Sequence, residues 1–213
     1  MIQAALFDLD GTLTDTLRDI ADAMNRSLSR LGLPAFPIDA YRYLVGDGAK
    51  VLARRCAGGH PEMAGELQAI YQADYERHTL VTTRPYDGIP ELLTALRERG
   101  VRTAVLSNKP DADTRGVVRH FFTGSFDLVR GQLPGVPLKP DPTAALSICE
   151  ALGLPPERWL YFGDTAVDMT CARNAGMHPV GVTWGFREAE ELREAGAESL
   201  ISRPEEALSL LNP

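Results

Sequence analysis

The sequence has few cysteines, few lysines and no long hydrophobic run, and each shortage excludes a class of protein. Its three cysteines, Cys56, Cys149 and Cys171, are odd in number and widely scattered, which argues against a disulfide framework and a cysteine-based metal site. No apolar stretch approaches the length of a transmembrane helix, and no leader with charged and apolar regions precedes the first predicted strand. We therefore expect a cytoplasmic protein with reduced thiols and no presequence.

Positive charge is also scarce. The 22 Lys and Arg residues are outnumbered by 29 Asp and Glu residues, giving a net charge of −7, which argues against general nucleic-acid binding and against binding to anionic membranes. Only three of the basic residues are lysines, namely Lys50, Lys109 and Lys139. Because lysine is a compact point charge and arginine a fixed fork, each lysine stands out in a chain that otherwise uses arginine.

The order of the predicted elements divides the chain into two parts. Residues 2–7 are an apolar run too short for a typical helix, and we interpret them as a buried strand. Residues from about 16 to 80 have almost only helical periodicity, whereas strands and helices alternate from residue 85 onward. The alternation predicts an α/β fold with a Rossmann-like core, in which helices flank a parallel sheet. We assign residues 1–15 and 82–213 to a catalytic core and residues 16–81 to a small inserted all-α cap domain.

Polar residues end three of the predicted strands. After the first strand, the predicted strands cover residues 101–106, 126–129, 159–162, 178–182 and 199–201, and the predicted helices cover residues 16–31, 38–45, 49–57, 62–78, 89–99, 111–120, 141–152, 166–175, 188–195 and 204–211. Ligand sites in such sheets lie beyond the carboxyl ends of the strands. The strand ends carry Asp8 with Asp10, Ser107 with Asn108, and Gly163 with Asp164. We expect one polar edge there, with the helical insertion above it as a lid.

Two carboxylates close the first strand. Because side chains alternate along a strand, Asp8 and Asp10 are expected to point to the same side, and Gly11 allows a sharp turn. Two adjacent carboxylates repel unless a proton or a cation relieves them, and oxygen-rich sites suit Mg²⁺. An ordinary Asp-Gly turn is the alternative interpretation. An EF-hand loop does not fit, because Leu13 would occupy the position that needs glycine.

The later candidate positions also have ordinary structural explanations. Asp164 and Asp168 share a helix face, where like charges four residues apart destabilise by about 0.2–0.5 kcal/mol and a cation would reverse the sign. Alternatively, Asp164 is a helix N-cap and Asp168 an acid favoured by the helix dipole. Ser107 could simply terminate a strand, and Lys139 could be an exposed loop lysine. The order in which these residues follow one another is more specific than any of them alone.

In that order the motifs resemble the haloacid dehalogenase-like superfamily of phosphohydrolases. The matching segments are Asp8-Leu9-Asp10-Gly11-Thr12-Leu13, Ser107-Asn108, Lys139-Pro140, and Gly163-Asp164-Thr165 with Asp168. The resemblance spans essentially the whole chain and implies that the helical insertion is a cap of the family's first type. Within the superfamily, Val45 to Leu52 and Thr183 to Phe186 resemble the phosphoglycolate phosphatase group. Thr165 stands where many relatives have serine, which keeps the hydroxyl.

The resemblance implies a catalytic role for the acids. Asp8 would be the nucleophile that forms an aspartyl phosphate, and Asp10 would protonate the leaving alcohol and then deprotonate the hydrolytic water. Mg²⁺ would be held by the Asp8 side chain, the Asp10 backbone carbonyl and Asp164, with Asp168 in support, directly or through water. True dehalogenases and phosphonatases lack the second acid, so Asp10 argues against both.

The resemblance also implies which groups bind the phosphate. Ser107 and Lys139 would hold the phosphoryl oxygens together with backbone N–H groups near Asp10, at Gly11, and near Asn108. Phosphoryl transfer depends mostly on positioning and on charge stabilisation, so this set of groups is sufficient.

A loop in the predicted cap is a candidate for substrate recognition. Gly46-Asp47-Gly48 leads into a helix N-terminus, where free N–H groups and the helix dipole attract anions. Lys50 and Arg54 follow at a spacing that places them on one helix face. We predict that Gly46, Gly48, Lys50 and Arg54 recognise the carboxylate of 2-phosphoglycolate. A solvated basic face is the alternative.

The predicted function is a Mg²⁺-dependent phosphatase of a small phosphorylated metabolite, by resemblance 2-phosphoglycolate, acting as a monomer or homodimer. An inorganic pyrophosphatase, a sugar-phosphate or nucleotide phosphatase and a phosphosugar mutase are alternatives within the same superfamily. A non-catalytic phospho-acceptor such as a receiver domain also clusters acids around Mg²⁺, but it is shorter and has no helical lid. A degenerate binding protein does not fit the complete motif set.

Overall fold

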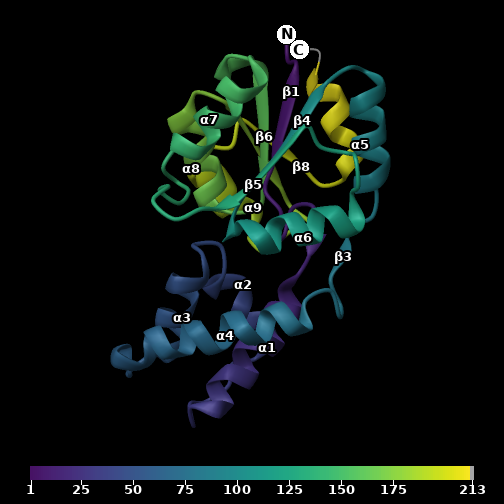
Figure 1. Cartoon of the computed structure of the whole chain (residues 1–213). Coiled ribbons are helices and arrows are strands. Elements are labelled where there is room, and N and C mark those ends of the chain that lie inside the picture. Colours follow the sequence, from purple (N-terminus) through teal and green to yellow (C-terminus); the bar gives the residue numbers. More distant parts are fainter. Residues whose placement is uncertain (212–213) are drawn as a thin grey trace.

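A parallel β-sheet forms the centre of the protein in a computed structural model that describes residues 1–211 (Figure 1). The sheet has six strands in the order β5-β4-β1-β6-β7-β8. Their bounds are β1 Ala4–Phe7, β4 Arg102–Pro110, β5 Leu128–Gln132, β6 Trp159–Gly163, β7 His178–Val182 and β8 Ser199–Ile201. Every neighbouring pair is parallel, and β1 lies between β4 and β6. The predicted α/β fold with a helix-flanked parallel sheet is confirmed.

Strand β1 is buried on both faces, which explains why its sequence is apolar throughout. Ala5 and Phe7 pack into the core on one face of the sheet, and Ala4 and Leu6 pack into the core on the other. The first core is covered by α5 (Ile89–Glu98), α6 (Asp111–Phe121) and the 3₁₀ helix η4 (Pro204–Leu211). The second is covered by α7 (Thr143–Leu152) and α8 (Ala166–Ala175), on the opposite side in Figure 1. Helix α9 (Ala189–Glu194) packs on β7 and β8, and η3 (Pro156–Arg158) precedes β6.

The segment between Asp15 and Arg84 forms a separate helical part next to the sheet (Figure 1). It contains α1 Leu17–Arg30, η1 Ile38–Ala40, α2 Tyr41–Leu44, α3 Ala49–Ala57, η2 Pro61–Met63 and α4 Ala64–His78. It has its own hydrophobic core, built around Met24, Leu28, Leu52 and Leu67. The helices expected over residues 16–31, 49–57 and 62–78 are therefore present, with ends shifted by one or two residues.

Two short strands mark the crossings between the parts. β2 (Thr14–Asp15) pairs antiparallel with β3 (Arg84–Pro85), and such two-residue strands have no periodicity that a sequence could show. Asp19 of α1 accepts hydrogen bonds from the backbone N–H and the hydroxyl of both Thr82 and Thr83, at 2.6–3.1 Å. Because these contacts lie beside residues 15/16 and 81/82, we propose them as the boundaries between core and cap.

Four elements differ from the prediction. The helix expected over 38–45 is a 3₁₀ turn, η1, followed by the four residues of α2. The strand expected over 101–106 extends to Pro110, because the end of β4 still pairs with Gln132 of β5 after a register shift. The strand expected over 126–129 lies at Leu128–Gln132, and the last helix is 3₁₀ throughout. The extension matters for the site, since it places three consecutive polar residues, 107–109, on the central sheet.

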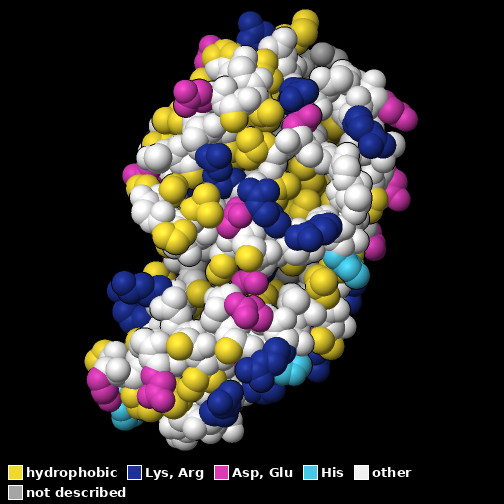
Figure 2. Space-filling model, viewed as in Figure 1, with side chains coloured by type: hydrophobic (Ala, Val, Ile, Leu, Met, Phe, Trp, Pro, Cys, Tyr) yellow, Lys and Arg dark blue, Asp and Glu magenta, His cyan; other side chains and the backbone are white. Residues whose placement is uncertain are grey.

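The outer surface mixes both signs of charge. On the face drawn in Figure 2, Lys and Arg side chains and Asp and Glu side chains are interspersed with apolar ones over both parts of the molecule. Within residues 1–211, no helix combines the length and the apolarity that crossing a bilayer requires.

Candidate functional site

Carboxylates from distant parts of the chain converge at the carboxyl edge of the sheet. Asp8 follows β1, Asp164 follows β6, and Asp168 lies in the first turn of α8. One oxygen of each lies within 4.8 Å of the others, and all three residues are buried. Lys139 lies among them, with Nζ 2.7 Å from Oδ1 of Asp8 and 2.7 Å from Oδ1 of Asp168. Four of the residues singled out from the sequence are thus in one cluster, which we call the acid cluster.

Asp168 holds its neighbours in place. Its Oδ2 accepts hydrogen bonds from the Thr165 hydroxyl at 2.7 Å and the Thr165 N–H at 3.2 Å, which completes a capping box at the start of α8. Its Oδ1 accepts from Lys139. Asp168 therefore orients Lys139 and caps α8 at the same time, which fits a supporting role.

Asp164 is fixed by hydrogen bonds and by two glycines. The Thr12 hydroxyl donates to Oδ1 at 3.0 Å and the Phe186 N–H donates to Oδ2 at 2.9 Å. A Cβ on Gly11 would lie 2.3 Å from Asp164 Oδ2, and a Cβ on Gly185 would lie 2.3 Å from Asp164 Cβ. Neither position can accept a side chain without displacing this carboxylate.

Gly11 therefore has a role that its sequence position did not reveal. The resemblance implies phosphate binding through the Gly11 backbone N–H, but that N–H donates to the Thr14 carbonyl at 2.8 Å. Gly11 has φ +90°, a conformation that favours glycine, and it packs directly against Asp164. In the structure, glycine at position 11 allows the loop after β1 to approach Asp164 closely.

The acid cluster carries more negative charge than the protein compensates. Burial, opposed by Lys139 and reinforced by Asp168, raises the pKa of Asp8 to about 7. Burial, with the neighbouring Asp168 and Asp8, raises the pKa of Asp164 well above its usual range. One lysine faces three carboxylates, which leaves two formal negative charges. Hard oxygen donors with that deficit fit a divalent cation of the Mg²⁺ type.

A cavity of about 60 Å³ lies between the sheet edge and the helical part. Its polar wall includes Asp8, Asp10 and Ser107, so the two carboxylates after β1 do face one space as expected. Its apolar wall includes Leu52 and Tyr71 of the helical part. The cavity thus has the acids on one side and a mostly hydrocarbon lid on the other.

Asn108 connects the two parts beside this cavity. Its Nδ2 donates to the Gly46 carbonyl at 3.0 Å and to the Lys139 carbonyl at 3.3 Å, and its Oδ1 accepts from the Lys139 N–H at 2.9 Å. The Oγ of Ser107, in the cavity wall, accepts from the Lys109 N–H at 3.2 Å. The side chain of Asn108 therefore braces the lid loop and Lys139, while phosphate binding through its backbone N–H stays a prediction.

Lys109 is a site residue whose residue type is rare in this chain but whose role no motif in the sequence predicts. It is buried, its Nζ lies 3.2 and 3.3 Å from the two Asp10 oxygens, and it stands 4.3 Å from the centroid of the Tyr75 ring in α4. The Asp10 side chain is thus directed to Lys109 and does not join the acid cluster. The expected metal contact through the Asp10 backbone carbonyl stays a prediction.

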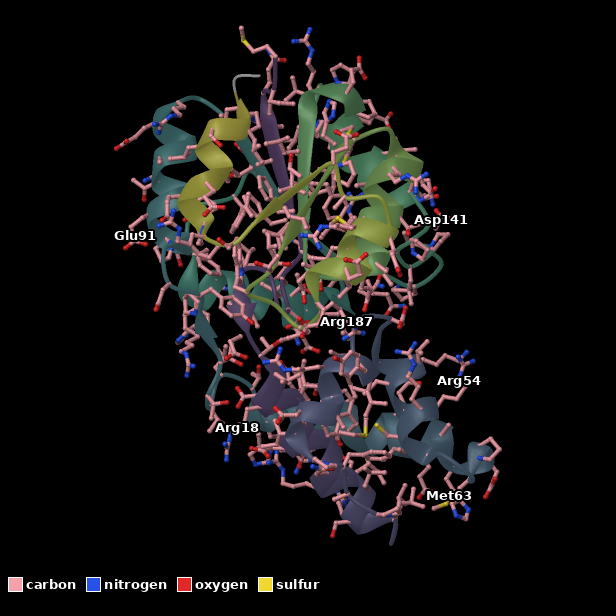
Figure 3. The ribbon with its side chains drawn as sticks, turned by 180° about the vertical axis from the view of Figure 1, so that it is seen from behind. Arg18, Arg54, Met63, Glu91, Asp141 and Arg187 are labelled. Atoms are coloured by element: carbon pink, nitrogen blue, oxygen red, sulfur yellow. The ribbon has the colours of Figure 1, made fainter. Side chains whose placement is uncertain are left out.

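The structure does not bring Lys50 and Arg54 to the cavity. Gly46 and Gly48 line it, but both basic residues are exposed, and Figure 3 shows Arg54 on the outer side of the helical part. They share a helix face, as their spacing predicts, but it is the face opposite the buried residues Leu52 and Cys56. For this pair the solvated basic face is the better interpretation.

Hydrogen bonds to backbone carbonyls attach the helical part to the sheet. Arg42 of α2 donates to the Gly185 carbonyl at 3.1 Å, and Arg187 donates in the reverse direction to the Val45 carbonyl at 3.1 Å. Figure 3 shows Arg187 at the junction of the two parts. Together with Asn108, these arginines hold the loop after α2 over the cavity.

Comparison with known proteins places this geometry in a family. The model of haloacid dehalogenase-like hydrolases matches residues 2–176. A phosphoglycolate phosphatase from Nitrosospira multiformis is 33% identical, with 99% of this chain and 96% of that protein covered. An N-acetylmuramic acid 6-phosphate phosphatase from Pseudomonas aeruginosa is 32% identical, with 99% and 95% covered. The crystal structure of a candidate phosphoglycolate phosphatase from Lactobacillus delbrueckii subsp. bulgaricus superposes with a TM-score of 0.93 at 29% identity, covering 98% of each chain.

Proposed function

Because this chain belongs to the haloacid dehalogenase-like hydrolase family, we propose that it is a Mg²⁺-dependent phosphatase of a small phosphorylated metabolite, with 2-phosphoglycolate as the substrate. The observation that carries the proposal is the acid cluster, whose Asp8 lies in the wall of a cavity that Asp10 also lines. Relatives named phosphoglycolate phosphatase support the choice of substrate.

Asp8, Asp164 and the Asp10 backbone carbonyl are the groups we propose to hold Mg²⁺. Asp168 supports them by holding Lys139 and the start of α8. When bound, the ion would neutralise the two uncompensated charges and so lower the repulsion between Asp8 and an incoming phosphate.

The reaction then proceeds in two steps, formation of an aspartyl phosphate on Asp8 and its hydrolysis. A carboxylate oxygen of Asp8 attacks phosphorus while the bond to the alcohol oxygen breaks and Asp10 gives that oxygen a proton. Asp10 next takes a proton from water, whose oxygen attacks the phosphorus of the aspartyl phosphate and regenerates Asp8. Ser107, Lys139 and backbone N–H groups hold the phosphoryl oxygens during both transfers.

The size of the cavity supports a small substrate. The space between the sheet edge and the helical part is about 60 Å³. That space suits a leaving group of few atoms, such as glycolate, better than an amino sugar such as the one in the name of the Pseudomonas aeruginosa relative. We also propose a cytoplasmic location, which the three scattered, buried free thiols fit.

The direct test is phosphate release from a panel of esters. We expect the highest kcat/KM with 2-phosphoglycolate in Mg²⁺, lower values with pyrophosphate, a hexose phosphate, a nucleoside monophosphate and N-acetylmuramic acid 6-phosphate, and loss of turnover in EDTA that Mg²⁺ restores. Another ester ranking first would replace the substrate. A single stoichiometric phosphorylation without turnover would instead indicate a phospho-acceptor.

Replacing Gly11 with alanine tests the metal site through its packing. The new Cβ would overlap Asp164, so we expect Gly11→Ala to lose the stabilisation that Mg²⁺ gives the folded protein. Mg²⁺ at 100 times its Kd adds about 2.7 kcal/mol, a rise in Tm of about 5–10 °C for a chain of this size. Thermal unfolding with and without Mg²⁺ measures the rise.

Gly32→Ala is the matched control for backbone strain. Gly32 also has positive φ, +69°, but a Cβ there would have nothing within 4 Å. This variant is expected to unfold at a lower temperature than the wild type yet keep the full Mg²⁺-dependent rise. An undiminished rise in Gly11→Ala would mean that Asp164 does not hold the ion.

A further inference from the structure

We propose that Lys109 selects substrates whose leaving group carries a second anionic group. The inference rests on the proposed phosphatase function and assigns the recognition of the leaving group to a residue of the sheet. It replaces the exposed cap residues Lys50 and Arg54, which the sequence had suggested for this purpose.

The position of Lys109 is the first observation. Among the described residues that line the cavity, Lys109 is the basic one, and it lies in the wall together with Asp10 and Ser107. Lys139, the other buried lysine, is engaged by Asp8 and Asp168 in the acid cluster and is not part of that wall. An anion beyond the phosphoryl group would therefore meet Lys109.

The surroundings of Lys109 are the second observation. Only 8% of the residue is exposed, and the Tyr75 ring lies 4.3 Å from Nζ, so the charge is shielded from water by the lid. The ammonium group has three N–H donors, and the two oxygens of Asp10 engage at most two of them. At least one donor is left for a ligand in the cavity.

The contact with Asp10 determines which end of the substrate lies next to Lys109. Asp10 is the group that we propose to protonate the leaving oxygen, and Lys109 contacts its carboxylate at 3.2 Å. Lys109 therefore lies beside the leaving group and away from the acid cluster. A carboxylate one carbon from the ester oxygen, as in 2-phosphoglycolate, is within reach of such a cation without a long spacer.

A charge series at position 109 separates selection from positioning. We would measure kcat/KM for 2-phosphoglycolate and for ethyl phosphate, which has the same two-carbon leaving group without the carboxylate. Lys109→Met is expected to lower the value for 2-phosphoglycolate about 10- to 150-fold more than the value for ethyl phosphate, the worth of a hydrogen bond between charged groups. Lys109→Arg keeps the charge and is expected to recover part of the difference.

Controls keep the outcomes distinct. Lys50→Met removes an exposed lysine and is expected to leave the ratio of the two values unchanged. Equal losses on both substrates, or a wild type that does not prefer the anionic one, would overturn the inference and leave Lys109 as a residue that positions Asp10. A wild type that releases phosphate from no ester would instead remove the proposed function.

A measurement on the unaltered protein covers the case in which the variants fail to fold, as judged by circular dichroism. Glycolate is expected to inhibit ethyl phosphate hydrolysis competitively. Ethanol at the same concentration is expected to cause no inhibition. Equal inhibition by the two alcohols would contradict a cation that recognises the leaving group.

Discussion

Asp8→Asn is expected to lower phosphatase turnover about 10⁴- to 10⁶-fold, the loss seen when the attacking group of an enzyme is removed. The amide that replaces the carboxylate has the same shape but cannot form the acyl phosphate. Phosphate release from 2-phosphoglycolate in Mg²⁺ measures the effect. Asp39→Asn, which removes an exposed acid of the helical part, is the control and should retain full turnover. Retention of even one per cent of the activity in Asp8→Asn would rule out Asp8 as the nucleophile.

Asp8→Asn is also expected to change how the stability of the metal-free protein depends on pH. Burial raises the pKa of Asp8 to about 7, so in the metal-free protein this residue stabilises the fold at low pH, and that contribution is lost as pH rises from about 4 through 7. Asparagine does not titrate. Metal-free Asp8→Asn is therefore expected to lose less stability than the wild type between pH 5 and pH 8 in thermal unfolding.

Lys139→Met is expected to have the largest effect on stability. Lys139 is only 5% exposed and bridges Asp8 and Asp168, so its removal leaves three buried carboxylates without their compensating charge. Breaking a buried charge network in this way costs about 3–5 kcal/mol, which corresponds to a fall in Tm of about 6–20 °C. Loss of a phosphoryl-oxygen donor is expected to lower kcat about 10²- to 10³-fold as well.

Mg²⁺ provides the internal control for this prediction. If the cause is uncompensated charge, a divalent cation should restore part of the lost Tm in Lys139→Met, whereas an equal concentration of Na⁺ should not. Lys50→Met, which removes an exposed lysine, should unfold within about 1 °C of the wild type. A stable, fully active Lys139→Met would contradict the arrangement of the acid cluster.

Much of the fold follows from local pattern. A buried central strand needs apolar residues on both faces, and Ala4–Phe7 are apolar throughout. The alternation of strands and helices after residue 85 is also visible in the sequence. The end of β4 does not follow from pattern. Ser107 to Lys109 are weak strand formers, and the pairs on either side of them, Leu106 with Arg130 and Pro110 with Gln132, depend on residues more than twenty positions away.

The candidate site was predictable where short motifs determine it, at the strand ends and in the loop that carries Lys139. Asp8, Lys139 and Asp164 belong to segments whose order is recognisable, and the sheet brings those segments together. The contact of Lys109 with Tyr75 was not predictable, because it depends on how α4 packs against the sheet. For Lys50 and Arg54 the sequence does contain a signal for an exposed position, since the apolar positions of α3 lie on the opposite face of the helix.

The carbonyl contacts that hold the lid loop have a consequence for how this enzyme could change. Asn108 and Arg187 grip main-chain oxygens of Gly46 and Val45, which every amino acid possesses. These two contacts do not depend on the side chain at position 45, although Val45 faces the substrate space. Substitutions at position 45 could therefore alter which substrates bind while these two hydrogen bonds to the loop backbone are kept.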